Sequence, residues 1–268
     1  MSFKNKFIEQ GYLGPVPVLN ATEIDYYYQH VVAAEQELDL AHSDYRYKSN
    51  VLFPWVDQLS KHPTIVNVVR ELIGDNFTCP DTIFWIKRPG ENRDVSWHQD
   101  ATYWNFTNPE KCCVVWYAFN DVTTSHGPLQ YIPGTHTQQI KHNDIKNNTN
   151  LLMRGQTVDY FVDQSVEVTV PAGNIVVHHP YIIHGSSFNT TNESRLAVSF
   201  IYASTDCKPR IEHSRESAVL ISGNDQYNFM QHDPAPRDPW ENNLSVWRDA
   251  YDRQHDNYFR LTQRPAGQ

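Results

Sequence analysis

The sequence predicts a mostly β fold, an antiparallel sandwich or jelly roll, that follows a helical N-terminal part. From residue 77 onward, short segments rich in β-branched and aromatic residues alternate with turn signals such as Pro89-Gly90 and Pro133-Gly134. Before that point, apolar residues recur with the spacing of amphipathic helices. A length of 268 residues fits one domain or at most two, and we expect a single domain.

Residues 1–75 form the predicted helical part. A short amphipathic helix begins near Phe3 and ends near Gly11. Asn20, followed by Glu23 three residues later, is typical of a helix N-cap with a capping carboxylate. The segment from there to residue 40 carries one apolar face, made of Ile24, Tyr27, Val31, Ala34 and Leu38. A further helix is expected over Thr64–Ile73.

Residues 76–204 form the predicted β core. Six strands are expected, at Phe77–Lys87, Cys112–Phe119, Leu129–Pro133, Ser165–Val170, Asn174–His178 and Arg195–Ala203. The segment 135–160 is polar, which indicates an insertion. Residues 205–268 are polar and aromatic with weak periodicity, so we expect a tail or a lid that is mobile without substrate.

Composition excludes several classes of protein. Lysine and arginine number 22 and acidic residues 31, so the net charge is −9, which disfavours nucleic-acid binding. The sequence has no apolar stretch long enough for a membrane span and no visible signal peptide, so a cytoplasmic protein is expected. The four cysteines lack metal-binding CxxC spacing, and buried thiols are the expected state.

His98 and Asp100 are the first candidate metal ligands. In an extended segment, residues i and i+2 project from the same face, so the two side chains can hold one ion. The best third ligand is His184, although His178 and His179 lie on the same stretch. Two imidazoles and one carboxylate on one face of an octahedron are typical of non-haem Fe(II) oxygenases, which need open coordination positions.

Arg195 begins the smaller face of an expected core strand, in which bulky apolar residues occupy the other face. A guanidinium in that place indicates a carboxylate clamp, because it pairs with a carboxylate in a bidentate fork. The alternative is an arginine at a strand end that extends toward water. The strand alone does not decide between them.

These motifs together resemble the phytanoyl-CoA dioxygenase family of Fe(II)/2-oxoglutarate oxygenases over about residues 5–205. The resemblance rests on His98-Gln99-Asp100, on His184-Gly185-Ser186 and on an arginine eleven residues after His184. It extends to the segments Trp97 with Tyr103-Trp104, Gly127-Pro128-Leu129, Ile132-Pro133-Gly134-Thr135-His136 and Pro171-Ala172-Gly173-Asn174. His126 and Asn174 depart from the usual family residues at positions that touch no ligand.

The resemblance implies a double-stranded β-helix, the cupin-like jelly roll, with N-terminal helices packed on it. It implies that His98, Asp100 and His184 bind iron, and that Arg195 and Ser186 bind the distal carboxylate of 2-oxoglutarate. Trp116 falls where the family places an aromatic residue beside the co-substrate. The family's lysine contact has no clear match, and Lys87 is the candidate.

The implied reaction uses 2-oxoglutarate and O₂ to oxidise a C–H bond, most simply by hydroxylation, and releases succinate and CO₂. Halogenases of the superfamily lack the metal-binding carboxylate, so Asp100 disfavours halogenation. The continuation to Trp104 resembles bacterial members that act on specialised metabolites or amino-acid-like molecules, which favours a small-molecule substrate over a fatty acyl-CoA. Candidate substrate contacts are Tyr103, Trp104, Lys87 and Arg93, with core packing or solvated charge as the alternatives.

Two other classes of function stay open at this point. A jelly-roll metal enzyme that is not an oxygenase, such as an isomerase, would need no Arg195 clamp. A binding module with a degenerate site would have lost a ligand, and all three ligands are present. The protein is expected to be a monomer or a homodimer.

Overall fold

The structure is a computed structural model that describes residues 3–145, 149–152, 155–211 and 216–262. The chain forms two compact units, each assembled from segments that are far apart in the sequence. The first unit contains residues 1–44, 84–102 and 114–199, and the second contains residues 45–83, 103–113 and 200–268. Among the described residues, no helix has both the length and the apolar character that crossing a bilayer requires.

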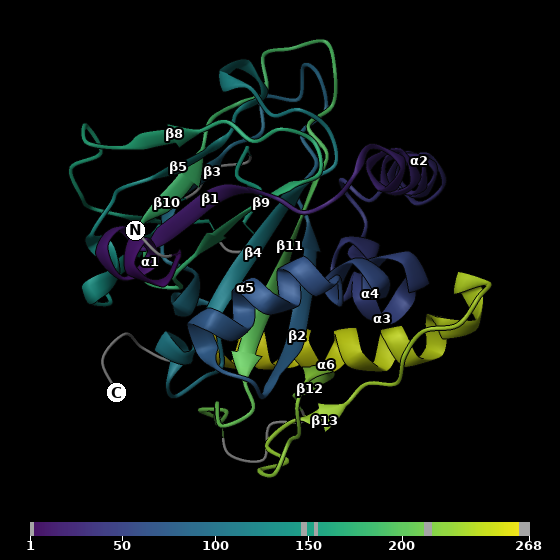
Figure 1. Ribbon diagram of the computed structural model, residues 1–268. Helices are drawn as coiled ribbons and strands as arrows, with labels where there is room; N and C mark the ends of the chain where they lie inside the picture. Colours follow the sequence, from purple (N-terminus) through teal and green to yellow (C-terminus); the bar gives the residue numbers. More distant parts are fainter. Residues whose placement is uncertain (1–2, 146–148, 153–154, 212–215, 263–268) are drawn as a thin grey trace. The chain divides into compact units, whose positions relative to one another are not determined.

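Two helices belong to the first unit, as the sequence predicted. They are α1 (Phe3–Gln10) and α2 (Ala21–Leu38) (Figure 1). The capping box at the start of α2 is confirmed, because the Asn20 side chain accepts the backbone N–H of Glu23 while the Glu23 carboxylate accepts that of Asn20. Tyr27, Val31 and Ala34 form the buried face of α2.

A strand, β1 (Tyr12–Pro17), separates these helices, at a place where no strand was predicted. β1 lies at the end of the larger sheet and pairs with β9 (Asn174–His178). An edge strand needs N–H groups on one side only, so it tolerates Pro15 and Pro17, whose nitrogens donate no hydrogen bond. The helical prediction for residues 1–75 therefore needs this correction.

The other helices belong to the second unit. They are α3 (Ser49–Leu52), α4 (Pro54–Ser60), α5 (Pro63–Ile73) and α6 (Leu244–Thr262). The predicted helix over Thr64–Ile73 is thus confirmed in α5. Within the described residues, short 3₁₀ turns occur at η1 (Asp44–Arg46), η2 (Asp100–Thr102), η3 (Pro109–Lys111), η4 (Thr124–His126), η5 (Thr135–Thr137) and η6 (Trp240–Asn243).

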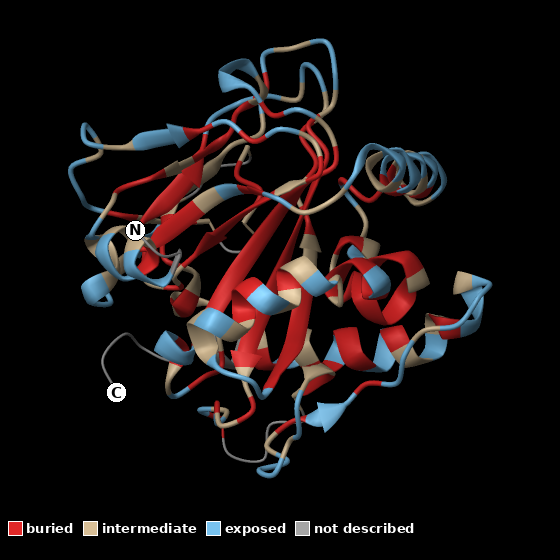
Figure 2. Cartoon of the chain, in the orientation of Figure 1, coloured by how far each residue is buried: buried red, intermediate tan, exposed pale blue. Residues whose placement is uncertain are grey.

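The larger sheet has seven strands in the order β1-β9-β4-β11-β2-β12-β13. Its remaining strands are β2 (Phe77–Phe84), β4 (Cys112–Ala118), β11 (Ala197–Ser204), β12 (Ser217–Ser222) and β13 (Gln231–His232). β2, β4 and β11 have residues in both units. β4 is buried along its whole length (Figure 2).

The smaller sheet has four strands, all in the first unit, in the order β3-β10-β5-β8. They are β3 (Val95–His98), β10 (His184–Ser186), β5 (Leu129–Tyr131) and β8 (Val166–Val168). The polar insertion near 135–160 contains a two-stranded hairpin of β6 (His142–Asp144) and β7 (Gln156–Val158).

The two sheets enclose the apolar core of the first unit. One buried cluster joins Trp116 and Val176 of the larger sheet to Leu129, Tyr131 and Val168 of the smaller sheet. Burying one such aliphatic or aromatic side chain stabilises a fold by about 1.5–3 kcal/mol. This two-sheet arrangement confirms the predicted jelly-roll class.

The C-terminal segment contains more regular structure than its weak periodicity predicted. β12 pairs with β2 in the larger sheet, and α6 places Trp247, Ala250 and Tyr251 in the core of the second unit. The indole of Trp247 donates to the backbone carbonyl of Tyr47 at 2.9 Å. The lid function of residues 205–268 stays a prediction.

Candidate metal centre

The three predicted metal ligands come together in the first unit, at one end of the smaller sheet. His98 is the last residue of β3, and His184 is the first residue of β10. The two strands are antiparallel, and His98 and His184 are directly paired across them. Asp100 begins the 3₁₀ turn η2 immediately after β3. The extended i, i+2 geometry expected for His98 and Asp100 is therefore wrong, because a turn brings the carboxylate to the imidazoles.

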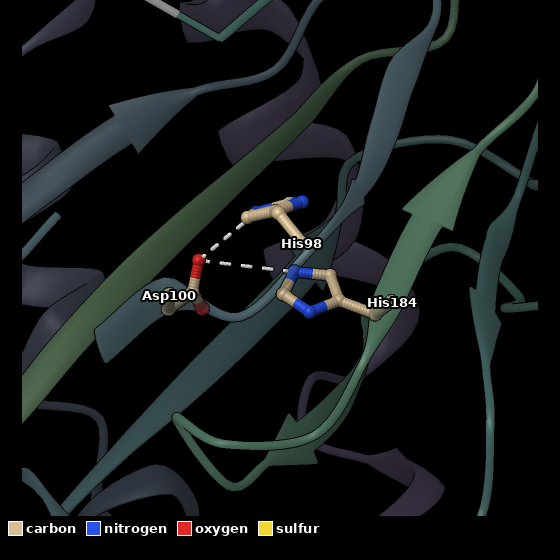
Figure 3. Close-up of side chains that lie close together, drawn as sticks. All are labelled: His98, Asp100 and His184. Atoms are coloured by element: carbon tan, nitrogen blue, oxygen red, sulfur yellow. Dashed lines mark hydrogen bonds and ion pairs between the residues drawn. The ribbon is translucent and has the colours of Figure 1, made fainter. Parts of the chain in front are cut away.

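One carboxylate oxygen of Asp100 faces both imidazoles (Figure 3). Its Oδ1 lies 3.3 Å from His98 Nε2 and 3.8 Å from His184 Nε2. The candidate ligand atoms of the three residues all lie within 4.8 Å of one another. This spacing suits a single ion that lies about 2.0–2.2 Å from each ligand atom.

Backbone carbonyls fix the orientation of both imidazoles. His98 Nδ1 lies 2.8 Å from the carbonyl of Ser96, and His184 Nδ1 lies 3.1 Å from the carbonyl of Ile182. A carbonyl only accepts hydrogen bonds, so each Nδ1 carries a proton, and Nε2 is the nitrogen of each ring that would bind a metal. This is the arrangement in which a histidine binds a metal while its other nitrogen is held by the protein.

The protonation states of the group suit a cation. Burial raises the pKa of Asp100, but His184, His178 and His98 outweigh it and bring that pKa well below its ordinary value. Burial and His98 lower the pKa of His184 well below its ordinary value. At neutral pH the group therefore contains an ionised carboxylate and a neutral His184, as metal binding requires.

Gln99 lies between the candidate ligands His98 and Asp100 in the sequence, and its hydrogen bonds connect this turn to two loops. Its side-chain amide donates to the carbonyl of Gln138 at 2.9 Å and also contacts the carbonyl of Tyr181, while its Oε1 accepts the N–H of Ile140 at 2.8 Å. The backbone N–H of Gln99 donates to His142 Nε2 of the insertion hairpin at 2.9 Å. The insertion near 135–160 thus helps to hold the turn, a role that the sequence did not predict.

The residues predicted to bind 2-oxoglutarate form a second buried group in the same unit. Lys87 Nζ lies 2.7 Å from Ser186 Oγ, and the Arg195 guanidinium lies 5.6 Å from the ring centre of Trp116. Arg195 donates to the carbonyl of Gly127 at 2.7 Å and is 1% exposed, as is Lys87. Burial and Arg195 lower the pKa of Lys87 to about 5.

Arg195 does not begin the core strand that the sequence predicts. That strand is β11, which lies between β4 and β2 in the larger sheet, whereas the His184 strand, β10, lies in the smaller sheet. Arg195 also precedes β11 and forms an isolated bridge with Lys87. The side chain is nevertheless fully buried, so the alternative of an arginine that extends to water is wrong.

The predicted substrate contacts other than Lys87 are dispersed. Tyr103 and Trp104 belong to the second unit, where Tyr103 stacks on Tyr258 and Trp104 packs against Phe106. Arg93 lies half-buried in the loop before β3. Substrate binding by these residues stays a prediction.

The competing histidines have other contacts. His179 packs against Phe7 and His136, and His136 contacts the backbone carbonyl of Ile8 at 3.0 Å. His178 lies beside Asp100, on the side of its other carboxylate oxygen, Oδ2. The four cysteines are free and buried, as expected.

The chain belongs to the phytanoyl-CoA dioxygenase (PhyH) family, whose model matches residues 7–197. A probable phytanoyl-CoA dioxygenase of Caenorhabditis elegans is 31% identical over 163 residues, which cover 57% of this chain and 52% of that protein. The match thus spans about half the length of such a relative. The residues 7–197 that the family model matches include His98, Asp100, His184 and Arg195.

Solved structures share the fold. The non-heme monooxygenase ThoJ, in its apo form, has a TM-score of 0.87 at 22% identity, covering 98% of this chain and 99% of that one. The epimerase SnoN, in complex with Fe3+, alpha ketoglutarate and nogalamycin RO, has a TM-score of 0.64 at 20% identity, covering 83% and 95%. At these identities the likeness establishes the fold.

Proposed function

We propose that this protein is an Fe(II)- and 2-oxoglutarate-dependent dioxygenase that hydroxylates a C–H bond of a small molecule. The observation that carries the proposal is the buried group of His98, Asp100 and His184, with a buried arginine and lysine in the same unit. Two imidazoles and one carboxylate leave three positions of an octahedral ion open, which is the requirement of this chemistry.

The donor set fits iron. Both imidazoles direct Nε2 toward Asp100, and the lowered pKa values of Asp100 and His184 keep these two donors deprotonated where iron would bind. When bound, the metal would supply the oxidising chemistry. The protein supplies the orientation of these groups and a site enclosed between two sheets.

The second buried group fits the far carboxylate of 2-oxoglutarate. Ser186 is two residues after the ligand His184, and its hydroxyl contacts Lys87. Arg195 lies close enough to Lys87 to lower its pKa. Arg195 is a buried cation, and the adjacent Lys87 becomes one when it takes up a proton, so the two groups favour an anion between them, since burial of charge is stabilised by pairing. The ring of Trp116 would form one side of this subsite.

The proposed reaction consumes one substrate C–H bond, one O₂ and one 2-oxoglutarate, and yields one alcohol, one succinate and one CO₂. The two-electron oxidation of 2-oxoglutarate and the two-electron oxidation of the substrate together balance the four-electron reduction of O₂. Asp100 would take the coordination position that chloride needs in the halogenases of the superfamily, so halogenation is disfavoured. Desaturation and epimerisation share the same cofactors, and SnoN is an epimerase of this fold.

We propose a specialised metabolite or an amino-acid-like compound as the substrate, bound as a small molecule by a monomer or homodimer in the cytoplasm. Tyr103, Trp104 and Arg93 are the proposed substrate contacts beside Lys87. The complex of SnoN with nogalamycin RO supports a small-molecule substrate by likeness of fold.

An anaerobic titration with Fe(II) and then 2-oxoglutarate tests the metal and the co-substrate together. We expect a weak visible charge-transfer band in the parent protein and none in His98→Ala, with Arg93→Ala as a control outside the metal group. Absence of the band in the parent protein, at concentrations where it stays folded, would contradict the proposal. A screen for substrate-dependent succinate release, with mass analysis of the product, then identifies the substrate, and a chlorinated product would contradict hydroxylation.

A further inference from the structure

His178 contacts the metal-binding carboxylate but is not one of the predicted ligands. It ends β9 of the larger sheet, whereas His98 and His184 lie on the smaller sheet. Its Nε2 lies 3.0 Å from Asp100 Oδ2, the oxygen opposite the one that faces the other two imidazoles. Its Nδ1 lies 2.9 Å from the hydroxyl of Tyr131.

The partners of His178 determine where its proton lies. A carboxylate only accepts hydrogen bonds, so His178 Nε2 carries a hydrogen and donates it to Asp100. In a neutral imidazole the other nitrogen is then an acceptor, so the Tyr131 hydroxyl donates to Nδ1. Tyr131, His178 and Asp100 thus form a chain of two hydrogen bonds. Because Nε2 of His178 carries a hydrogen and Nδ1 accepts one, neither nitrogen offers a free lone pair to a metal bound at Asp100 Oδ1.

The hydrogen-bonded chain is enclosed by the fold. His178 is 2% exposed and Tyr131 is fully buried. Tyr131 is paired with His184 across β5 and β10, and Tyr12 is paired with His178 across β1 and β9. The rings of Tyr12 and Tyr131 stack at 4.7 Å with an interplanar angle of 11°. Because water has little access here, a lost hydrogen bond would leave a buried polar group unsatisfied.

We propose that His178, held by Tyr131, is a positioning residue that keeps Asp100 a monodentate ligand through Oδ1. By engaging Oδ2 it prevents the carboxylate from taking a second coordination position, which the 2-oxo acid and O₂ need. The inference rests on the proposed metal site and adds the residue that sets the geometry of its carboxylate. Such outer partners typically change metal affinity about 10–100-fold when removed.

Co(II) is the probe for the test, because its visible absorption reports both affinity and ligand geometry without turnover. We expect His178→Leu to weaken Co(II) binding about 10–100-fold and to change the absorption spectrum. His178→Gln keeps a side-chain N–H donor, so it should recover part of both. Tyr131→Phe should shift the spectrum in the same direction by a smaller amount.

His179→Leu is the matched control, because it removes the next imidazole on the chain, which packs against Phe7 and not against Asp100. We expect parental affinity and spectrum from it. The inference is overturned if His178→Leu keeps the parental affinity and spectrum, or if it abolishes binding as fully as His98→Ala does, which would make His178 a ligand. If His178→Leu does not fold, His178→Gln and Tyr131→Phe decide by the same criteria. A parent protein that binds no Co(II) would instead contradict the metal site itself.

Discussion

Arg195 is the residue on which the co-substrate proposal depends most directly. Removing one partner of a buried charge pair typically costs about 2–5 kcal/mol. At about 1.4 kcal/mol per tenfold change, we expect Arg195→Ala to raise the apparent 2-oxoglutarate constant roughly 30-fold or more. Steady-state succinate release at saturating iron measures this constant.

Arg195→Lys is the control for charge. It should recover only part of the loss, because an ammonium cannot form the two parallel hydrogen bonds of a guanidinium. Metal binding should change little in either variant, since Arg195 is not part of the metal group. Parental 2-oxoglutarate binding by Arg195→Ala would show that the clamp assignment is wrong.

Lys87 leads to a prediction about proton uptake. Burial and Arg195 lower its pKa to about 5, so Lys87 is mostly neutral at pH 7. A bound carboxylate favours the ammonium and raises that pKa, so 2-oxoglutarate binding should take up as much as one proton. Affinity should consequently fall as pH rises above 5. Calorimetry at pH 7 in two buffers of different ionisation enthalpy measures the uptake.

Lys87→Met is the control for this proton. It should bind 2-oxoglutarate more weakly and without the buffer-dependent heat assigned to Lys87. Equal binding heats for the parent protein in both buffers, after correction for dilution, would be inconsistent with Lys87 as the group that gains the proton.

The individual ligands differ in how far sequence alone could predict them. His98, Asp100 and His184 were predicted because each belongs to a short motif that the sequence shows directly, and the structure places them in one group. The contact between His178 and Asp100 depends on which residue of β9 faces β3 across the core, and local sequence carries no such information. The sequence did not indicate a functional role for Tyr131, since a tyrosine in a strand most simply packs in the core.

At the scale of elements, the turn that precedes β5 supports the arginine. Gly127 has φ +63°, and its carbonyl accepts the Arg195 guanidinium. A Cβ at this position would lie 2.2 Å from the carbonyl oxygen of Ser187 and 2.7 Å from that of Phe188. We expect Gly127→Ala to lower the free energy of unfolding by about 2–4 kcal/mol, through left-handed strain and this backbone clash. Urea unfolding measures the loss.

Gly134→Ala is the matched control, because Gly134 also has a positive φ, +79°, but a Cβ there meets nothing within 4 Å. Its free energy of unfolding should fall only by the cost of the left-handed backbone, about 1–2 kcal/mol. Gly127→Ala should also weaken 2-oxoglutarate binding, since the acceptor of Arg195 must move, while Gly134→Ala should not. Equal losses of stability in the two variants would contradict the proposed clash.

The elements that the sequence did not predict share a physical cause. β1 contains Gly14, Pro15 and Pro17, which punctuate loops in most contexts and are tolerated here because β1 is an edge strand with an irregular register. α6 has Trp247 and Tyr251 at helical spacing, but its many charged residues mask the apolar stripe. Both elements depend on tertiary partners, which local pattern does not contain.

At the scale of the whole molecule, the predicted jelly roll followed from many short strands and their punctuation, and the pairing order did not. The order of strands along the sequence does not predict that β9 pairs between β1 and β4 while β10, a few residues later, belongs to the other sheet. That split is what gives the metal group two opposed walls. The division of the chain into two discontinuous units also lies beyond local pattern.

Metal binding should stabilise the whole fold by mass action. An ion that binds only the native state at about 100 times its dissociation constant adds about 2.7 kcal/mol to the free energy of unfolding. At about 2–4 °C per kcal/mol for chains near this size, Tm should rise by about 5–10 °C. Differential scanning fluorimetry under nitrogen, with Fe(II) added and then removed by a chelator, measures the shift. His98→Ala should lose the shift and Arg195→Ala should keep it, because the first removes a donor and the second leaves all three donors in place. A shift of equal size in His98→Ala would show that the stabilising ion binds elsewhere on this acidic chain.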